Sequence, residues 1–155
     1  MTKPIHDKAF GKLEFNGSWV REIELTFLGM KSTVELIVEG NDENESILEE
    51  QRVSYQKLSE IVPRAEAEIF KFYESICHGF RTQFGEEADT RMPTIEEKSD
   101  LATLVKLTGI VFPMVTDAGE ISVGFLLECS WDPEHGLAVK ITNDEAEVGT
   151  QDILT

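Results

Sequence analysis

Apolar and polar residues alternate with a period of two over the first forty residues, as is typical of strands with one buried face. Asn16-Gly17 interrupts the alternation and predicts a two-residue hairpin turn of type I′, because both central positions of that turn need a positive φ. LGMKS, residues 28–32, predicts a second turn. The apolar positions of the three expected strands are Leu13, Phe15, Ile23, Leu25, Phe27, Val34, Leu36 and Val38.

Residues 55–76 change to an apolar spacing of three and four, which predicts one long helix with a single apolar face. Pro63 lies within it, and because the spacing continues in register, we expect a kink there rather than a loop. Packing on the sheet explains this face, and a coiled-coil seam between two copies of the chain is the alternative. The stripe consists of Tyr55, Leu58, Val62, Ala65, Ile69, Phe72 and Ile76.

Acidic residues dominate the segment before this helix, EGNDENESILEE. A calcium loop of the EF-hand type starting at Asp42 would need glycine and glutamate where the chain has Ile47 and Val53, so that reading is excluded. Ser46 and Glu49 instead match a capping box, which predicts that the acids favour the start of the helix.

The pattern lapses over residues 79–92 and then predicts a shorter helix. This helix begins near Thr94 or at Ser99 and Asp100, ends at Gly109, and buries Leu101, Leu104, Val105 and Thr108. Strands follow at 109–115, 120–131, 137–142 and 147–153, with a turn at 117–119. The sequence therefore predicts a single α+β domain over residues 1–155, with antiparallel meanders at both ends and a long, Pro63-kinked helix and a shorter helix packed against the sheet.

Reactive side chains are most concentrated within LECSWDPEHGLAVKI, residues 127–141, where Cys129, Asp132, Glu134 and His135 lie close together. Strand alternation places Cys129 on the inward face, together with Phe125, Leu127 and Trp131. Asp-Pro favours a type I turn, in which the Asp132 carboxylate accepts a backbone N–H two residues on and Gly136 takes a left-handed conformation. We therefore expect a structural hairpin with a buried cysteine rather than a zinc or nucleophile site.

Other enzymatic signatures are missing from the sequence. It has no G-x-S-x-G elbow and no glycine-rich nucleotide loop, and Cys77 and His78 are neighbours on a helix that face different directions. A pair of carboxylates acting as acid and base stays open among 30 acidic residues. We predict no catalytic residue, cofactor or metal.

Charge narrows the choice of partners. The chain has 30 acidic and 14 basic residues, a net charge of -16, which repels nucleic acids and anionic membranes. Such a charge attracts a basic protein partner, although it also serves solubility. The first residues contain no apolar signal segment, no apolar run is long enough to cross a bilayer, and two cysteines make no disulfide framework, so we expect a cytoplasmic protein.

Several stretches together resemble an uncharacterised bacterial domain family, some of whose members occur in toxin-immunity settings. They are FGKLEF (10–15), LVKLTGIVFP (104–113), LECSWDPEHGLAVKI (127–141) and GTQDIL (149–154). The resemblance implies neither catalysis nor metal binding for Trp131, Asp132, Glu134, His135 and Gly136.

The leading hypothesis is a non-enzymatic immunity protein that covers the basic surface of a nuclease-like toxin domain. The alternatives are a small enzyme with its site between the long helix and residues 79–100, and an oligomeric scaffold, such as a homodimer, that uses the 55–76 stripe. The acids expected to contact a partner are Asp42, Glu43, Glu45, Glu49 and Glu50, followed by Asp132 and Glu134.

Overall fold

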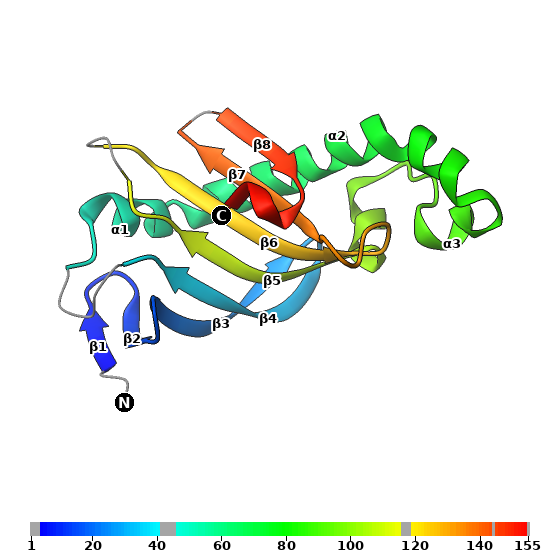
Figure 1. Ribbon diagram of the computed structural model, residues 1–155. Coiled ribbons are helices and arrows are strands. Elements are labelled where there is room, and N and C mark those ends of the chain that lie inside the picture. Colours follow the sequence, from blue (N-terminus) through cyan, green and yellow to red (C-terminus); the bar gives the residue numbers. More distant parts are fainter. Residues whose placement is uncertain (1–3, 41–45, 116–118, 144, 155) are drawn as a thin grey trace.

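The computed structural model describes residues 4–40, 46–115, 119–143 and 145–154 (Figure 1). Its strands form one sheet, ordered as they occur in the chain. The strands are β1 (Pro4–Asp7), β2 (Gly11–Phe15), β3 (Trp19–Phe27), β4 (Met30–Val38), β5 (Val105–Phe112), β6 (Ser122–Cys129), β7 (Leu137–Thr142) and β8 (Glu145–Gly149). The helices are α1 (Glu49–Gln56), α2 (Leu58–Phe84) and α3 (Ala88–Arg91), and the short 3-10 helices are η1 (Gly85–Glu87), η2 (Lys98–Thr103) and η3 (Gln151–Leu154).

Neighbouring strands are antiparallel except at the centre of the sheet. There β4 and β5 run parallel, with Glu35–Val38 beside Gly109–Phe112, and the helical segment between them forms the crossover that a parallel pair requires. The predicted α+β layout, with an antiparallel meander at each end, is confirmed. The parallel pair that joins the two meanders was not predicted.

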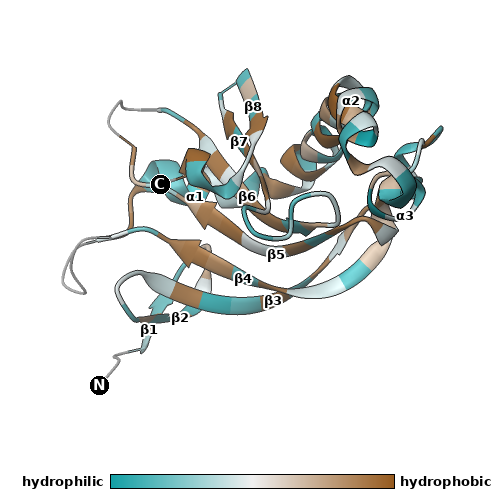
Figure 2. Cartoon of the chain, turned by 45° about the vertical axis from the view of Figure 1, so that its right-hand side comes forward, coloured by the Kyte–Doolittle hydropathy of each residue, from teal (hydrophilic) through white to brown (hydrophobic). Residues whose placement is uncertain are grey.

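The core lies between the sheet and α2. Ile69 of α2 and Phe125, Leu127 and Val139 of the sheet are fully buried in it. The opposite face of β6 is covered by η3, whose Leu154 lies against Gly124 (Figure 1). Figure 2 shows hydrophobic residues concentrated along the central strands and hydrophilic residues over α1 and α3. None of the described helices combines the length and apolar character that crossing a bilayer requires.

The predicted long helix is a pair of helices that meet at Lys57. α2 continues through Pro63, as the unbroken spacing predicts, and extends eight residues beyond Ile76, to Phe84. α1 begins at Glu49 with Leu48 as its N-cap, so the predicted capping box of Ser46 and Glu49 is wrong. The side-chain oxygen of Gln51 instead accepts the N–H of Leu48 at 2.9 Å.

The apolar stripe is confirmed in the first half of α2 and shifts by one residue in the second. Leu58, Val62, Ala65 and Ile69 are buried, but the row continues through Tyr73 and Cys77 rather than Phe72 and Ile76, which are only partly buried. The cause is the helical repeat: 3.6 residues per turn drift by about 20° per heptad relative to a 3.5-residue stripe. The stripe packs on the chain's own sheet, and homodimerisation stays a prediction.

The first N-terminal turn differs in type from the prediction, and the second lies within residues 28–32, as predicted. Asn16-Gly17 belongs to a three-residue loop between Phe15 and Trp19, in which only Gly17 has a positive φ. The two-residue turn with positive φ at both positions is Leu28-Gly29. Leu28 is buried, and its N–H donates to the Glu66 carboxylate of α2 at 2.5 Å, so tertiary contacts hold this leucine in a left-handed conformation.

The predicted helix from residue 94 or 99 to Gly109 is wrong in type and extent. The segment forms only the 3-10 helix η2, which ends at Thr103, and β5 begins at Val105. Asp100 supports the start of η2 by accepting the N–H groups of Glu96 and Glu97 at 3.2 and 3.1 Å. The predicted irregular segment 79–92 is largely helical, since it contains the end of α2, η1 and α3.

Candidate functional site

The reactive cluster between β6 and β7 is a structural turn. The thiol of Cys129 is buried, with 4% of the residue exposed, and donates to the backbone carbonyl of Asp132 at 3.5 Å. Burial is the main reason that the pKa of this thiol rises to about 11. Cys129 is therefore a neutral, protected thiol near neutral pH, as the strand alternation predicted.

The Asp132 carboxylate organises the turn. Its Oδ1 accepts the backbone N–H of His135 at 3.2 Å and lies 3.0 Å from His135 Nδ1. This N–H comes from three residues on, not two as predicted, while Gly136 has the expected positive φ and donates its N–H to the Asp132 carbonyl. The hydrogen bond to Asp132 raises the pKa of the exposed His135 ring. Within the described residues, no group of three histidine, cysteine or acidic side chains is arranged to hold a metal ion.

Thiol labelling tests this arrangement. In a Cys77→Ser variant, Cys129 is the only thiol, and we expect it to react with an aromatic disulfide reagent roughly 100-fold slower than a free cysteine, because the attacking thiolate is scarce and shielded. The measurement is the release of the coloured thiolate at pH 8, with the denatured variant as the fully reactive control. Rapid labelling of the folded protein would contradict a buried structural cysteine.

The seven acids expected to contact a partner are not all placed on one surface. Asp42, Glu43 and Glu45 lie outside the described residues. Glu49 and Glu50 lie on α1, whereas Asp132 and Glu134 lie in the β6–β7 turn, at the other end of the sheet (Figure 1). The described members thus form two separate acidic regions.

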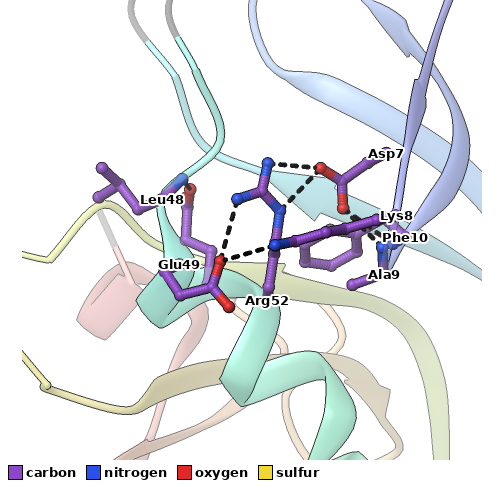
Figure 3. A network of polar contacts seen from close by, with 8 residues as sticks. Asp7, Lys8, Ala9, Phe10, Leu48, Glu49 and Arg52 are labelled. Carbon is purple, nitrogen blue, oxygen red and sulfur yellow. Dashed lines mark hydrogen bonds and ion pairs between the residues drawn. The ribbon is translucent and has the colours of Figure 1, made fainter.

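Both acids on α1 take part in contacts within the molecule. Glu49 Oε2 lies 3.1 Å from Arg52 Nη1 and 3.6 Å from Lys8 Nζ (Figure 3). Glu50 Oε2 accepts the N–H of Gly119 at 3.5 Å. Two of the acids that were expected to contact a partner, Glu49 and Glu50, therefore also join α1 to neighbouring segments of the chain.

The strongest polar contact of this region joins Asp7 to Arg52 and ties β1 to α1 (Figure 3). Asp7 Oδ1 accepts from Nε and Nη2 of Arg52, each at 2.8 Å, and Oδ2 accepts the N–H groups of Ala9 and Phe10 at 2.9 and 3.1 Å. Burial by itself raises the pKa of Asp7, but the hydrogen bonds from Arg52, Ala9 and Phe10 outweigh it and lower the pKa. The pair holds the N-terminal hairpin in place.

A small cavity of about 250 Å³ lies where the enzyme alternative placed a site, between α2 and residues 94–95. The polar groups around it hold the segment that follows α3. The Tyr73 hydroxyl donates to the Pro93 carbonyl at 2.5 Å, and the Cys77 thiol and Arg81 Nη1 contact the Met92 carbonyl at 3.7 and 3.1 Å. Glu74 supplies the one carboxylate among the described lining residues, so the paired carboxylates that would favour an enzyme do not converge here.

An acidic surface that the sequence did not single out lies on the face of β2–β4 opposite the helices. We call Glu14, Glu22, Glu24 and Glu35 the acidic sheet face; all four are exposed. Glu22 and Glu35 are directly opposite each other in the β3–β4 ladder. A hollow of about 390 Å³ lies over Glu14, Glu22 and Glu35, with Lys12 and Arg21 at its border. The signal in the sequence was REIELTF, residues 21–27, in which Glu22 and Glu24 alternate with Ile23 and Leu25.

Comparison with known proteins identifies a family. Neither a curated protein nor a solved structure matches the chain. A family model described as Domain of unknown function (DUF6985) matches residues 9–155, which include the strands from β2 to β8, the helices and the acidic sheet face. The chain belongs to this family.

Proposed function

We propose that the chain is a non-enzymatic bacterial binding protein that acts in the cytoplasm as an immunity protein, neutralising a basic, nuclease-like toxin domain. The observation that supports this function most is the placement of Glu22 opposite Glu35 on an exposed sheet face. Like charges directly opposite each other destabilise a sheet. Neither carboxylate forms an ion pair within the described part of the chain. A cationic partner bound at this face would relieve the repulsion between the two carboxylates, which explains why the chain keeps a pair that lowers its own stability.

The net charge of -16 supports the same function. A nuclease binds phosphates with a cationic cleft, and an acidic protein that covers this cleft substitutes its carboxylates for the phosphates. Complementary charge also raises the rate of encounter, by roughly 10–10³-fold.

Affinity purification of the tagged chain from a bacterium that encodes a member of this domain family tests the proposal. We expect one basic protein to be retained at low salt and released as salt increases, because screening weakens the attraction between exposed charges. A Glu22→Lys, Glu35→Lys variant should retain at least tenfold less of this partner. A Glu74→Lys, Glu86→Lys variant is the matched control, since it makes the same charge change at exposed positions elsewhere and should retain the partner.

Retention of no basic protein would contradict the proposed function. Equal loss in both double variants would instead mean that total charge matters and that the acidic sheet face has no special role.

A further inference from the structure

The outer edge of β3 is open over most of its length. β2 pairs with β3 only through Phe15–Trp19 and Glu14–Val20, whereas β3 continues to Phe27. Beyond Val20 the β1–β2 hairpin diverges from β3, and Arg21 Nη1 donates to the Phe10 carbonyl where the two part. Among the residues that the structure describes, residues 21–26 therefore have strand neighbours on the β4 side only.

The backbone of this edge is ready to accept another strand. In the two-residue hairpin at Leu28-Gly29, Phe27 and Met30 flank the turn as a hydrogen-bonded pair, and alternate residues of β3 then bond to β4. The N–H and C=O groups of Glu22, Glu24 and Thr26 consequently point away from β4. Within the described residues none of these groups has another backbone or side-chain partner. Such a row of unpaired groups is a template for pairing.

A groove of about 970 Å³ lies beside this edge, between β3 and the helices; we call it the β3 groove. Its β3 wall contains Ile23 and Leu25, both only partly buried. Its helical wall contains Tyr55, Leu58, Val62 and Pro63. Arg21, Glu22, Glu24 and Glu66 also line the groove, so its apolar surface on the helix side lies beside charged groups. The side chains of Glu22 and Glu24 alternate with those of Ile23 and Leu25 and point to the opposite face of the strand. There Lys31 Nζ lies 3.1 Å from Glu24 Oε2.

We propose that an extended segment of the basic partner binds here as an added strand alongside residues 21–26. This inference rests on the proposed function and names the surface that carries it. Successive side chains of a strand point to opposite faces. One set of the partner's side chains is therefore apolar and enters the β3 groove, and the alternate set is lysine or arginine and lies beside Glu22 and Glu24. Strand addition of this kind derives affinity from backbone bonds and specificity from the alternating pockets.

Charge argues against a second copy of the chain as the occupant. Two β3 edges related by a two-fold axis form an antiparallel pair, and registers centred on Glu22, Ile23 or Glu24 each place a glutamate opposite a glutamate. Like charges in that position are destabilising, and each copy carries a net charge of -16. A basic segment relieves this repulsion.

A pair of synthetic peptides tests the inference on the full chain. One peptide alternates lysine with valine over seven residues, and the other has the same composition with all lysines in one block. We expect the alternating peptide to bind at least tenfold tighter, as measured by fluorescence anisotropy. It should also protect the amides of Glu22, Glu24 and Thr26 from hydrogen exchange.

Two variants at one position separate strand pairing from charge. Glu24→Thr and Glu24→Pro both remove the carboxylate, but only proline removes the N–H at the open edge, where an edge strand tolerates it. We expect Glu24→Thr to weaken binding of the alternating peptide a few-fold and Glu24→Pro to weaken it at least tenfold further. If Glu24→Pro does not fold, amide protection in the unmodified chain decides the question.

The outcomes distinguish this inference from the proposed function. Equal binding of both peptides without protection of the β3 amides would overturn strand addition and leave an acidic surface that attracts basic chains. Binding of neither peptide would overturn strand addition, whereas the proposed function is decided by whether a basic protein is retained in the affinity purification.

Discussion

Replacing Gly136 with alanine should destabilise the fold by about 2–4 kcal/mol, the sum of a left-handed backbone and a steric overlap. Gly136 has a φ of 67°, and a Cβ there would lie 2.8 Å from the Leu127 carbonyl oxygen and 2.7 Å from Gln151 Nε2. Those two groups are hydrogen-bonded to each other at 2.8 Å. The added methyl group must therefore displace η3 from β6 or strain the turn. Urea unfolding measures the change.

Gly17 supplies the control, because its φ is 79° but a Cβ there would meet nothing within 4 Å. Gly17→Ala isolates the conformational penalty and should cost about 1 kcal/mol. Equal losses in the two variants would show that the contact between Gly136 and η3 contributes nothing.

Replacing Arg52 with alanine should destabilise the protein by about 2–4 kcal/mol, because it leaves the Asp7 carboxylate buried with only its backbone donors. The side chain of Asp7 is 4% exposed and that of Arg52 20% exposed, which places this pair away from bulk water. Lys8→Ala is the control. The Lys8 side chain is 71% exposed and pairs with Glu49, so its loss should lower the free energy of unfolding by less than about 0.5 kcal/mol. A loss for Arg52→Ala as small as that for Lys8→Ala would contradict the structural role of the pair.

This pair also predicts a pH dependence. The pKa of Asp7 is lowered in the fold from an ordinary value of 3.8, so its stabilising contribution is present above pH 3.8 and is lost as pH falls through the folded pKa. The difference in unfolding free energy between the original chain and Arg52→Ala should therefore narrow below pH 3.8. A difference that stays constant or widens there would assign the effect of Arg52 to packing alone.

Local chemistry explains which parts of the fold were predictable. The β6–β7 turn follows from Asp132, Pro133 and Gly136, whose preferences act within a few residues. The start of β5 does not follow from local preferences, because Leu101, Leu104 and Val105 have helical spacing and predict a helix there. The Ser130 N–H bonds to the Leu104 carbonyl, and Val105 pairs with Cys129, so contacts distant in sequence end the helical turn. The parallel β4–β5 pair likewise depends on where the crossover returns the chain.

The acidic sheet face could not be predicted from the sequence, because it also depends on contacts between residues that are distant in the chain. Acidic residues are densest in the sequence between residues 39 and 50, which favoured that segment as the contact surface. Two described members of it, Glu49 and Glu50, instead contact other parts of the chain. Glu22 and Glu35 are distant in sequence and become a like-charged pair only through the register of β3 and β4. The open edge depends on where β2 leaves β3, which no spacing in the sequence indicates.

The rate of association with the basic partner, measured by stopped flow as a function of salt, tests most directly whether the negative surface governs function. The proposed function predicts that the rate constant falls at least tenfold between low and high salt, as screening removes the attraction. It also predicts that the Glu22→Lys, Glu35→Lys variant loses most of this salt dependence, whereas the Glu74→Lys, Glu86→Lys variant retains it. A rate constant that is indifferent to salt, with both variants unchanged, would contradict the proposal.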